Sequence, residues 1–505
     1  MAPTKKARTC LKIELSNRWA RFYVDPEVQL DLKPLYSYLV KNADRIDSVR
    51  NEEWDGRDTL FNRSRVPSGL FIEKLAELQK HYELEITDVR ETPKFVTGKI
   101  EVRDYQKAAV DAMVENSSVG GIIVAATGTG KTRTAAAYFS RLDGCAIFVV
   151  DELGLLLQTR DALAELLHET VGIVGKSEVM IERITVATVQ TLKLHRHDKV
   201  FQKWFNRVDV IVIDELHVMI NKRSDDVIRS AKPLAVFGLT ATVELQHEYI
   251  KVPAIALCGP VIFVYPLQQG VADGHLSRGL VVAVTFPDPL RGQMPHSYDT
   301  VIKGKTVRIS GSHPSAFYRF HIALNRYRND AIATLAIEGV KAGRTVVVLV
   351  ERKDHVTVLR RRFLSANIPH GVIAGFVKAQ ERRKHMADLQ SGKISLVLAS
   401  RVFGKGADVP RIDMIVDGTG LPGRNATHQR YGRGTRNEKG KRGLLYFDIS
   451  DAGTAFEKTA RSRRVAYREL GTEIKTVLWK NNPRNIVQFA EREISNILRK
   501  SNSSS

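Results

Sequence analysis

The segment AATGTGKT at Ala125–Thr132 has the residue types of a phosphate-binding loop. Glycine has no Cβ, so Gly128 and Gly130 let backbone N–H groups approach phosphate oxygens closely. The Lys131 ammonium can then reach the terminal phosphates of a nucleoside triphosphate, and the Thr132 hydroxyl can bind Mg²⁺. The alternative is a tight strand–helix turn in which the lysine is incidental. The residues expected to hold the nucleotide here are Ala126, Thr127, Gly128, Thr129, Gly130, Lys131 and Thr132.

A second motif, IVIDELH at Ile211–His217, supplies carboxylates after the apolar, β-rich run Val208–Ile213. We expect Asp214 to hold Mg²⁺ through water and Glu215 to act as the general base that polarises an attacking water. Taken alone, the pair could equally be a solvated acidic loop. Its place after an apolar run and downstream of the lysine loop favours catalysis. We expect His217 to sense the γ-phosphate and couple it to the rest of the molecule.

Two shorter segments extend this site. In VRDYQ, Gln106 offers both an amide donor and an acceptor, which suits the edge of an adenine. We assign Arg103 of the same segment to the nucleotide-binding residues as well. An ordinary helix start is the alternative. The hydroxyls of GLTAT at Gly238–Thr242 could link the nucleotide site to a bound strand, although a plain turn would have the same composition.

The segment QRYGRGTR at Gln429–Arg436 contains two arginines three positions apart. On a helix, Arg433 and Arg436 would share one face. Two guanidiniums there could neutralise the charge that develops on a γ-phosphate, which is the role of an arginine finger. A basic, solvated helix face is the alternative. The upstream phosphate loop favours the catalytic interpretation.

Composition points to a nucleic-acid partner. The chain has 505 residues, 77 Lys and Arg against 56 Asp and Glu, and a formal net charge of +21. A positive field attracts polyphosphate, although a merely basic soluble protein would share this charge. The three cysteines, Cys10, Cys145 and Cys258, give neither a disulfide framework nor metal-ligand spacing, so we expect a reducing interior. No signal peptide or membrane-spanning run is visible, so a soluble, cytoplasmic protein is expected.

Apolar β-rich runs alternate with helical stretches in two successive series, which predicts an α/β protein with two parallel-sheet domains. The first series has runs at Gly121–Ala125, Ala146–Val150, Ile184–Ala187, Val208–Ile213 and Ala235–Leu239. The second has runs at Arg344–Val350, Gly371–Ala374, Ser395–Ala399, Met414–Val416 and Leu444–Phe447. The predicted regions are a small α/β (α+β) N-terminal domain at 1–95, sheet domains at 96–262 and 331–470, a connection at 263–330 and a helical tail at 471–505.

The order of these motifs resembles that of superfamily 2 helicases over about 98–450. The series is VRDYQ, AATGTGKT, TVQTL (Thr188–Leu192), DELH, GLTAT, ASRVFGKGADVP (Ala399–Pro410) and QRYGRGTR. The resemblance implies two RecA-like domains with ATP between them and nucleic acid across both. It also implies that hydrolysis opens and closes the cleft.

Individual roles follow from the same resemblance. Thr188 and Gln190 look like strand-contacting residues of the first domain. Gly406 and Asp408 would complete the nucleotide site from the second, with Asp408 near the ribose. The usual threonine of that motif is Ser400 here, which keeps the hydroxyl. The implied catalytic set is Lys131, Asp214, Glu215, His217, Gln429, Arg433 and Arg436.

The N-terminal segment EWDGRDTLFNRSRVPSGL (Glu53–Leu70) resembles the start of UvsW-type branched-DNA helicases of bacteriophages. It implies a small domain that engages duplex DNA at a junction. Arg57, Arg63 and Arg65 are candidates for phosphate contacts. Trp54 could stack on a base or pack internally, and packing is favoured.

We therefore expect an ATP- and Mg²⁺-dependent DNA helicase or translocase that unwinds or branch-migrates forks, Holliday junctions or D-loops. Such an enzyme would serve recombination, replication and fork repair in a phage-infected bacterial cell, with single-strand-binding or recombination proteins as partners. The alternatives are a duplex translocase of the restriction or excision-repair type, an RNA helicase, or a clamp that binds ATP without hydrolysis. DELH is neither DEAD nor DECH, which weakens the RNA alternative. Intact Lys131, Glu215, Arg433 and Arg436 argue against the clamp.

Overall fold

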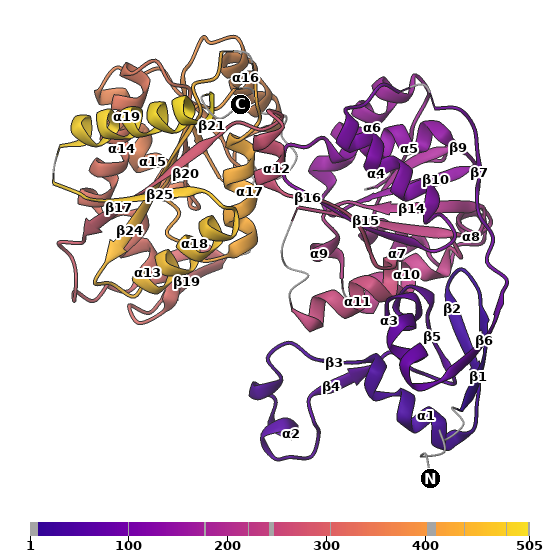
Figure 1. The fold of residues 1–505 in the computed structure, drawn as a ribbon. Helices are drawn as coiled ribbons and strands as arrows, with labels where there is room; N and C mark the ends of the chain where they lie inside the picture. Colours follow the sequence, from indigo (N-terminus) through magenta and orange to yellow (C-terminus); the bar gives the residue numbers. More distant parts are fainter. Residues whose placement is uncertain are drawn as a thin grey trace. The chain divides into compact units, whose positions relative to one another are not determined.

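The computed structural model describes residues 9–98, 100–175, 178–220, 222–241, 247–302, 305–400, 411–438, 440–480 and 482–502. The chain divides into two compact units, one formed by 1–126 and 130–265 and the other by 266–505 with 127–129. Each unit contains a large, mainly parallel sheet with helices packed against it (Figure 1). The predicted α/β fold class is confirmed. No helix in the described ranges has both the length and the apolar character needed to cross a membrane.

The first unit begins with a small α+β domain built on a four-stranded sheet in the order β5-β2-β1-β6. The ring of Phe22 on β2 contacts the rings of Tyr36, Phe61 and Phe71, which form its aromatic core. The elements are β1 (Cys10–Leu15), β2 (Trp19–Tyr23), α1 (Pro26–Leu32), β3 (Ser37–Leu39), α2 (Asp47–Arg50), β4 (Arg57–Thr59), β5 (Arg65–Pro67), α3 (Ser68–His81) and β6 (Glu83–Asp88).

The remainder of the first unit is an eight-stranded sheet in the order β12-β11-β13-β10-β14-β15-β8-β16, in which only the β11–β12 pair is antiparallel among the described strands. Its strands are β8 (Gly120–Ala125), β10 (Cys145–Val150), β11 (Gly172–Gly175), β12 (Glu178–Met180), β13 (Ile184–Thr188), β14 (Val208–Ile213), β15 (Ala235–Thr240) and β16 (Val261–Tyr265). Its helices are α4 (Asp104–Glu115), α5 (Lys131–Arg141), α6 (Leu153–Leu167), α7 (Val189–His195), α8 (Lys199–Phe205), α9 (Leu216–Met219), α10 (Lys222–Ser230) and α11 (Glu248–Cys258). A short pair, β7 (Lys94–Phe95) and β9 (Leu142–Asp143), lies beside it.

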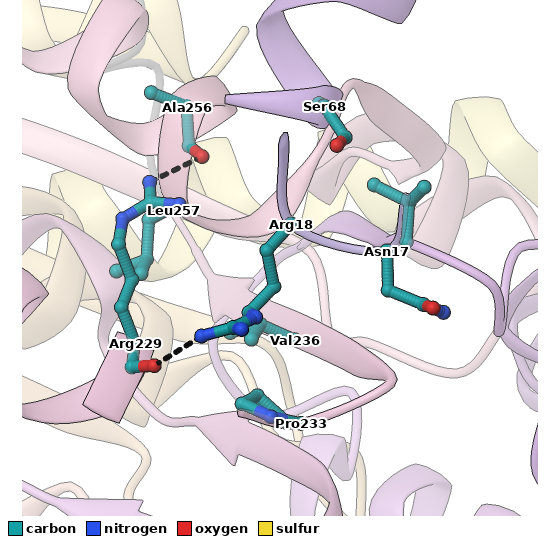
Figure 2. A pocket seen from close by; sticks show the side chains of 10 residues that line it. Asn17, Arg18, Ser68, Arg229, Pro233, Val236, Ala256 and Leu257 are labelled. Atoms are coloured by element: carbon teal, nitrogen blue, oxygen red, sulfur yellow. Dashed lines mark hydrogen bonds between the residues drawn. The ribbon is translucent and has the colours of Figure 1, made fainter. Parts of the chain in front are cut away.

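A polar seam joins the N-terminal domain to this sheet domain. Asn17 Nδ2 donates to the carbonyl oxygen of Ser118 at 2.8 Å, and Arg18 donates to the carbonyl oxygen of Arg229 on α10 at 3.1 Å. Arg229 in turn donates to the carbonyl oxygen of Ala256 on α11 at 2.5 Å. Figure 2 shows Arg18 and Arg229 lining a small pocket along this seam. The seam therefore ties the β1–β2 turn to the loop before β8 and to α10 of the sheet domain.

Close backbone packing supports the same seam. At Gly69, near the start of α3, an added Cβ would lie 2.4 Å from the carbonyl oxygen of Ile255 on α11. A side chain at this position would push the two helices apart. The N-terminal domain is thus fitted to α11 as a complementary surface.

The second unit contains a fully parallel seven-stranded sheet in the order β21-β22-β20-β23-β24-β17-β25. Its strands are β17 (Gly279–Pro287), β20 (Val346–Leu349), β21 (Gly371–Ile373), β22 (Leu396–Ala399), β23 (Met414–Asp417), β24 (Leu444–Ala452) and β25 (Glu473–Leu478). Its helices are α12 (Leu267–Ala272), α13 (Pro314–Tyr318), α14 (Arg326–Lys341), α15 (Lys353–Ser365), α16 (Ala379–Gln390), α17 (Arg424–Gly434), α18 (Glu457–Glu469) and α19 (Pro483–Asn502). A hairpin of β18 (Tyr298–Ile302) and β19 (Lys305–Ile309) accompanies it.

This sheet extends beyond the range 331–470 at both ends. Strand β17 comes from the segment expected to connect the domains, and it pairs with β24 and β25. Strand β25 and helix α19 come from the expected tail. The sequence GLVVAVTFP of β17 is as apolar as a central strand. Because a Pro- and Gly-containing stretch follows it, the sequence did not indicate that β17 belongs to the second sheet. The C-terminal segment is therefore part of the second unit's core.

A buried ion pair anchors α19 to this sheet. The guanidinium of Arg344 is fully buried and contacts both carboxylate oxygens of Glu491 at 2.7 Å. It also donates to the carbonyl oxygens of Asp413 and Gly443. Removing one partner of a buried pair leaves an uncompensated charge, which is costly.

We expect Glu491→Gln to lower the free energy of unfolding of the second unit by about 3 kcal/mol, because Arg344 would keep its charge without a counterion. Denaturant unfolding of the purified protein measures this. The matched control is Glu493→Gln on the same helix, whose carboxylate pairs with Lys475 at 3.1 Å near the surface, and for which we expect a loss of less than about 1 kcal/mol. Equal losses for the two variants would contradict the anchoring role of Glu491.

Candidate active site

The predicted nucleotide-binding residues of the first unit gather at one edge of its sheet. Strands β14, β15 and β8 are neighbours and run parallel, so their carboxyl ends meet there. The phosphate loop follows β8, Asp214 and Glu215 follow β14, and Thr240 ends β15. In open α/β sheets this edge is where ligands bind.

The phosphate loop connects β8 to the start of α5. Gly128 and Gly130 have φ values of +91° and +77°, which favour glycine. The Nζ atom of Lys131 donates to the carbonyl oxygen of Ala125 at 3.3 Å. This long bond keeps the ammonium over its own loop, where a phosphate oxygen could replace the carbonyl. The N–H groups at the start of α5 favour an anion at the same place.

Glu215 has the conformation and environment of a reactive group. Its φ and ψ of 47° and 52° are left-handed, a conformation that costs a non-glycine residue about 1 kcal/mol or more and is concentrated at active sites. Its N–H donates to Asp214 Oδ1 at 3.0 Å, and the Asp214 N–H donates to the carbonyl oxygen of Val149 at 2.9 Å. Glu215 Oε2 is buried without a hydrogen-bond partner among the described residues. Such an oxygen suits a base that accepts a proton from water.

His217 links two strands at this edge. Its Nδ1 atom lies 3.3 Å from the hydroxyl of Thr240 and 3.6 Å from Oε2 of Glu215. The imidazole is only 6% exposed. This position is compatible with the predicted coupling role, because a movement of Glu215 would displace His217 and, through it, Thr240 of the GLTAT segment. Thr242 of that segment lies outside the described residues.

Gln106 serves as a helix start and also lies beside the phosphate loop. Its Oε1 accepts the N–H of Arg103 at 3.1 Å, which stabilises the first turn of α4. A Cβ added at Gly130 would lie 2.7 Å from its Nε2. The two interpretations of VRDYQ are therefore compatible. Contact of Gln106 with adenine remains a prediction, and the Arg103 side chain is exposed.

Thr188 and Gln190 of the TVQTL segment lie in different environments. The Thr188 hydroxyl is buried, caps α7 and lies 2.9 Å from the Thr191 hydroxyl. Gln190 is exposed and donates to the carbonyl oxygen of Asp151 at 3.3 Å. Thr188 therefore supports the helix start, and contact of the exposed Gln190 with a nucleic-acid strand stays a prediction.

In the second unit, the predicted shared helix face of Arg433 and Arg436 is wrong. Helix α17 ends at Gly434, so Arg433 is helical and Arg436 is not. The Thr435 hydroxyl donates back to the carbonyl oxygen of Gly432 at 2.8 Å, and the backbone of Arg436 then forms a β-bridge with Leu276. The chain turns out of the helix before the second arginine.

Sequence reasoning missed Arg430, which lies within the same motif. Its guanidinium contacts Asp417 Oδ2 at 3.0 Å, and the Tyr446 hydroxyl donates to the same oxygen at 2.8 Å. Burial alone would raise the pKa of Asp417, but Arg430 and Arg463 outweigh it and hold the pKa below its ordinary value. Arg430 thus anchors α17 to β23. Gln429 is partly buried on the same helix, and Gly406 and Asp408 lie outside the described residues.

The arginines of the N-terminal motif also separate. Arg57 contacts Glu248 on α11 at 3.3 Å and donates to the carbonyl oxygen of Ser37 at 3.1 Å, both at the surface, and its contact with phosphate stays a prediction. The Trp54 indole donates to the carbonyl oxygen of Arg57 at 3.0 Å, with 36% of the residue exposed. Arg63 and Arg65 form no ion pair with a carboxylate in the described part of the chain. They remain available for phosphate.

The residues present fit a Mg²⁺–nucleotide. Mg²⁺ takes few protein ligands and keeps several waters, so Thr132 and Asp214 are sufficient. Among the described residues, no group of three or more His, Cys, Asp or Glu could hold a metal on its own. A nucleotide phosphate would have to complete the coordination, and Mg²⁺ would then neutralise charge on it.

Residues 99–245 match the family described as type III restriction enzyme, res subunit, and residues 328–438 match the helicase conserved C-terminal domain. The first match contains the phosphate loop and DELH, and the second contains QRYGRGTR. The chain is a superfamily 2 helicase. Nucleotide use follows from the two helicase domains.

Two curated relatives are similar to this helicase. The DNA 3′-5′ translocase XPB2 of Sulfurisphaera tokodaii is 25% identical over 415 residues, which cover 77% of the helicase and 90% of XPB2. The EcoAI endonuclease subunit of a type I restriction enzyme from Escherichia coli is 27% identical over 398 residues, 72% of the helicase and 47% of the subunit. The helicase therefore spans less than half of the restriction subunit.

One solved structure with a similar fold is Saccharomyces cerevisiae Dbp5 bound to RNA and ADP BeF3, which has a TM-score of 0.54 at 14% identity, covering 84% of the helicase and 96% of the Dbp5 chain. At this identity the likeness to Dbp5 describes the fold alone. T4 UvsW aligns with a TM-score of 0.43 at 17% identity, covering 93% of the helicase and 100% of its own chain.

We expect Glu215→Gln to bind ATP with nearly unchanged affinity but to lower kcat for ATP hydrolysis by about 10²-fold or more, because the amide cannot accept the proton of the attacking water. Steady-state ATPase assays and nucleotide-binding titrations separate the two effects. Glu178→Gln, on the exposed edge strand β12 of the same sheet, is the matched control. A Glu215→Gln enzyme with parental kcat would remove Glu215 from the base role.

Proposed function

We propose that this helicase is an ATP-dependent DNA helicase or translocase that acts on branched DNA. The observation that carries the proposal is an arginine surface on the N-terminal domain, formed by Arg21, Arg63 and Arg65. None of the three pairs with a carboxylate in the described ranges. Uncompensated arginines on a small domain beside an ATPase core suit contact with a DNA backbone.

The geometry of the arginine surface supports an anionic ligand. Arg21 on β2 and Arg65 on β5 are opposite each other in the strand register. Arg63 lies in the turn before β5, where it has φ of 50° and is exposed. Burial, together with the charges of Arg229 and Arg65, lowers the pKa of Arg18. A phosphate bound at Arg65 would reduce the repulsion between the Arg65 and Arg18 guanidiniums.

Trp19 joins the arginine surface to the first sheet domain. Its ring has the Arg65 guanidinium at 4.6 Å on the N-terminal side and the Arg229 guanidinium at 5.3 Å on the α10 side. Cation–π contacts of this kind hold both groups in place. Duplex DNA bound by the arginine surface would therefore be bound beside the ATPase domain and moved with it. Forks and junctions present a duplex arm next to the strand on which a helicase acts.

A duplex translocase of the restriction or repair type is a second candidate. The similarity to XPB2, a translocase by name, and to a restriction subunit favours it. An arginine surface would serve such an enzyme as well. ATPase stimulation by linear duplex, single-stranded DNA, RNA, a fork and a four-way junction distinguishes the candidates. Branched substrates should stimulate most under the proposal, linear duplex should match them for a translocase, and RNA should dominate for an RNA helicase.

We expect Lys131→Ala to abolish ATP turnover while DNA binding stays detectable by gel shift, because the ammonium acts on nucleotide phosphates and not on DNA. The exposed Lys80→Ala on α3 is the control. Hydrolysis by Lys131→Ala at the parental rate would contradict the assignment of the phosphate loop.

We expect Arg21→Gln with Arg63→Gln to weaken fork binding about tenfold and to lower the salt dependence of log K by about 2, one for each lost phosphate contact. Fluorescence anisotropy at several salt concentrations measures both. Arg50→Gln on α2, whose partner is the exposed Asp47, is the matched control in the same domain. An unchanged salt slope would show that the arginine surface does not contact DNA.

A further inference from the structure

Contacts with the segment 274–277, and not a helix, hold Arg436 in position. Beyond the end of α17, its backbone pairs with Leu276, and the Thr435 carbonyl accepts the N–H of Ser277 at 2.6 Å. The amide of Asn437 donates to the carbonyl oxygen of Gly274 at 2.7 Å. Residues 434–437 are therefore held on one side by the segment 274–277.

Lys441 holds the other side of this segment. Its Nζ donates to the carbonyl oxygen of Arg436 at 2.7 Å and to that of Gly434, the last residue of α17. The Gly434 carbonyl lies at the end of α17, and the other carbonyl belongs to Arg436 itself. An ammonium at a helix C-terminus is also favoured by the helix dipole. One side chain thus fixes both the end of α17 and the backbone of Arg436.

The surroundings of Lys441 give it no direct carboxylate partner in the described ranges. Asp413 and Glu438 are the acidic groups near it, and Arg411 and Arg344 are the basic ones. The carboxylate of Asp413 is engaged by Arg411 at 3.1 Å. The hydrogen bonds of Lys441 go to carbonyl groups, so the ammonium serves the backbone geometry of residues 434–436.

We propose that Lys441 is a positioning residue for Arg436, through which it sets the rate of ATP hydrolysis. The inference rests on the proposed function and on the sequence prediction that Arg436 neutralises charge on the γ-phosphate. Such an arginine acts in the transition state, where a small misplacement costs far more than in the ground state. Loss of Lys441 should therefore lower kcat and leave nucleotide and DNA binding nearly unchanged.

A double-mutant cycle on the full-length chain tests this. We expect Arg436→Ala to lower kcat about 10³-fold and Lys441→Met about 10- to 100-fold, each with less than about a threefold change in KM for ATP. The double variant should be no slower than Arg436→Ala alone, because Lys441 acts through Arg436. Lys480→Met, an exposed lysine of the same unit, is the matched control and should keep parental kcat.

A pH profile gives a second reading that a purely structural role would not move. Burial lowers the pKa of Lys441 to about 8, so its charge is lost as the pH rises through that value. We expect the parental kcat to fall several-fold between about pH 7 and pH 9. Lys441→Arg keeps its charge in this range. It should retain most of the kcat that Lys441→Met loses, without the fall.

The outcomes separate the two claims. If Arg436→Ala hydrolyses ATP at the parental rate, the finger role fails and the proposed function loses that residue. If Arg436→Ala is slow but Lys441→Met is not, or if the losses in the double variant multiply, the positioning role of Lys441 is wrong while the finger role stands. The same conclusion follows if Lys441→Arg shows the parental fall with pH.

Discussion

The parallel hydrogen bonding of β14, β15 and β8 is the constraint on which the chemistry of the first unit depends. Because these strands are neighbours with one direction, Glu215, Thr240 and the loop before Lys131 must lie at one edge. A shift of register by one residue would turn every side chain of a strand to the opposite face. The strands are buried on both faces, so this edge is rigid enough to hold Glu215 in a strained conformation. The position of His217 between Glu215 and Thr240 follows from the same pairing.

The second unit orients its helices with buried charges. Arg328 pairs with Asp451, Arg430 with Asp417 and Arg463 with Asp448, all nearly inaccessible to solvent. Asp417 ends β23, Asp448 lies in the middle of β24 and Asp451 lies near its end, and the arginines come from α14, α17 and α18. Buried pairs of this kind are often no more stabilising than apolar residues, but removal of one partner is costly. Here the pairs orient the helices, because each guanidinium fixes the angle of one helix against the strands. Helix α17 carries Arg433, so that angle bears directly on the proposed chemistry.

The strands and the motif residues could be predicted from the sequence, whereas their tertiary partners could not. Runs such as VDVIVI are apolar over their whole length, which is the pattern of a strand covered on both faces. The places of Lys131 after β8 and Glu215 after β14 could be predicted because the two motifs follow apolar runs in the sequence. Helix α17 ends at Gly434, a residue type that commonly ends helices, but the bridge that Arg436 then forms with Leu276, far away in the sequence, could not be predicted. The ion pair of Arg57 with Glu248 could not be predicted either, because nothing near Arg57 in the sequence reveals that partner.

The seam around Trp19 changes what the N-terminal domain can do. A DNA-binding module on a free linker would raise the local concentration of substrate without feeling the ATPase cycle. Here Arg18 and Asn17 hydrogen-bond to the backbone of the first sheet domain, and Trp19 lies between Arg65 and Arg229. Arg229 belongs to α10, the helix that follows DELH and α9 in the chain. If ATP turnover moves the two RecA-like units against each other, the arginine surface must move with the first unit. Under the proposed function, a duplex arm held there would be displaced at each cycle.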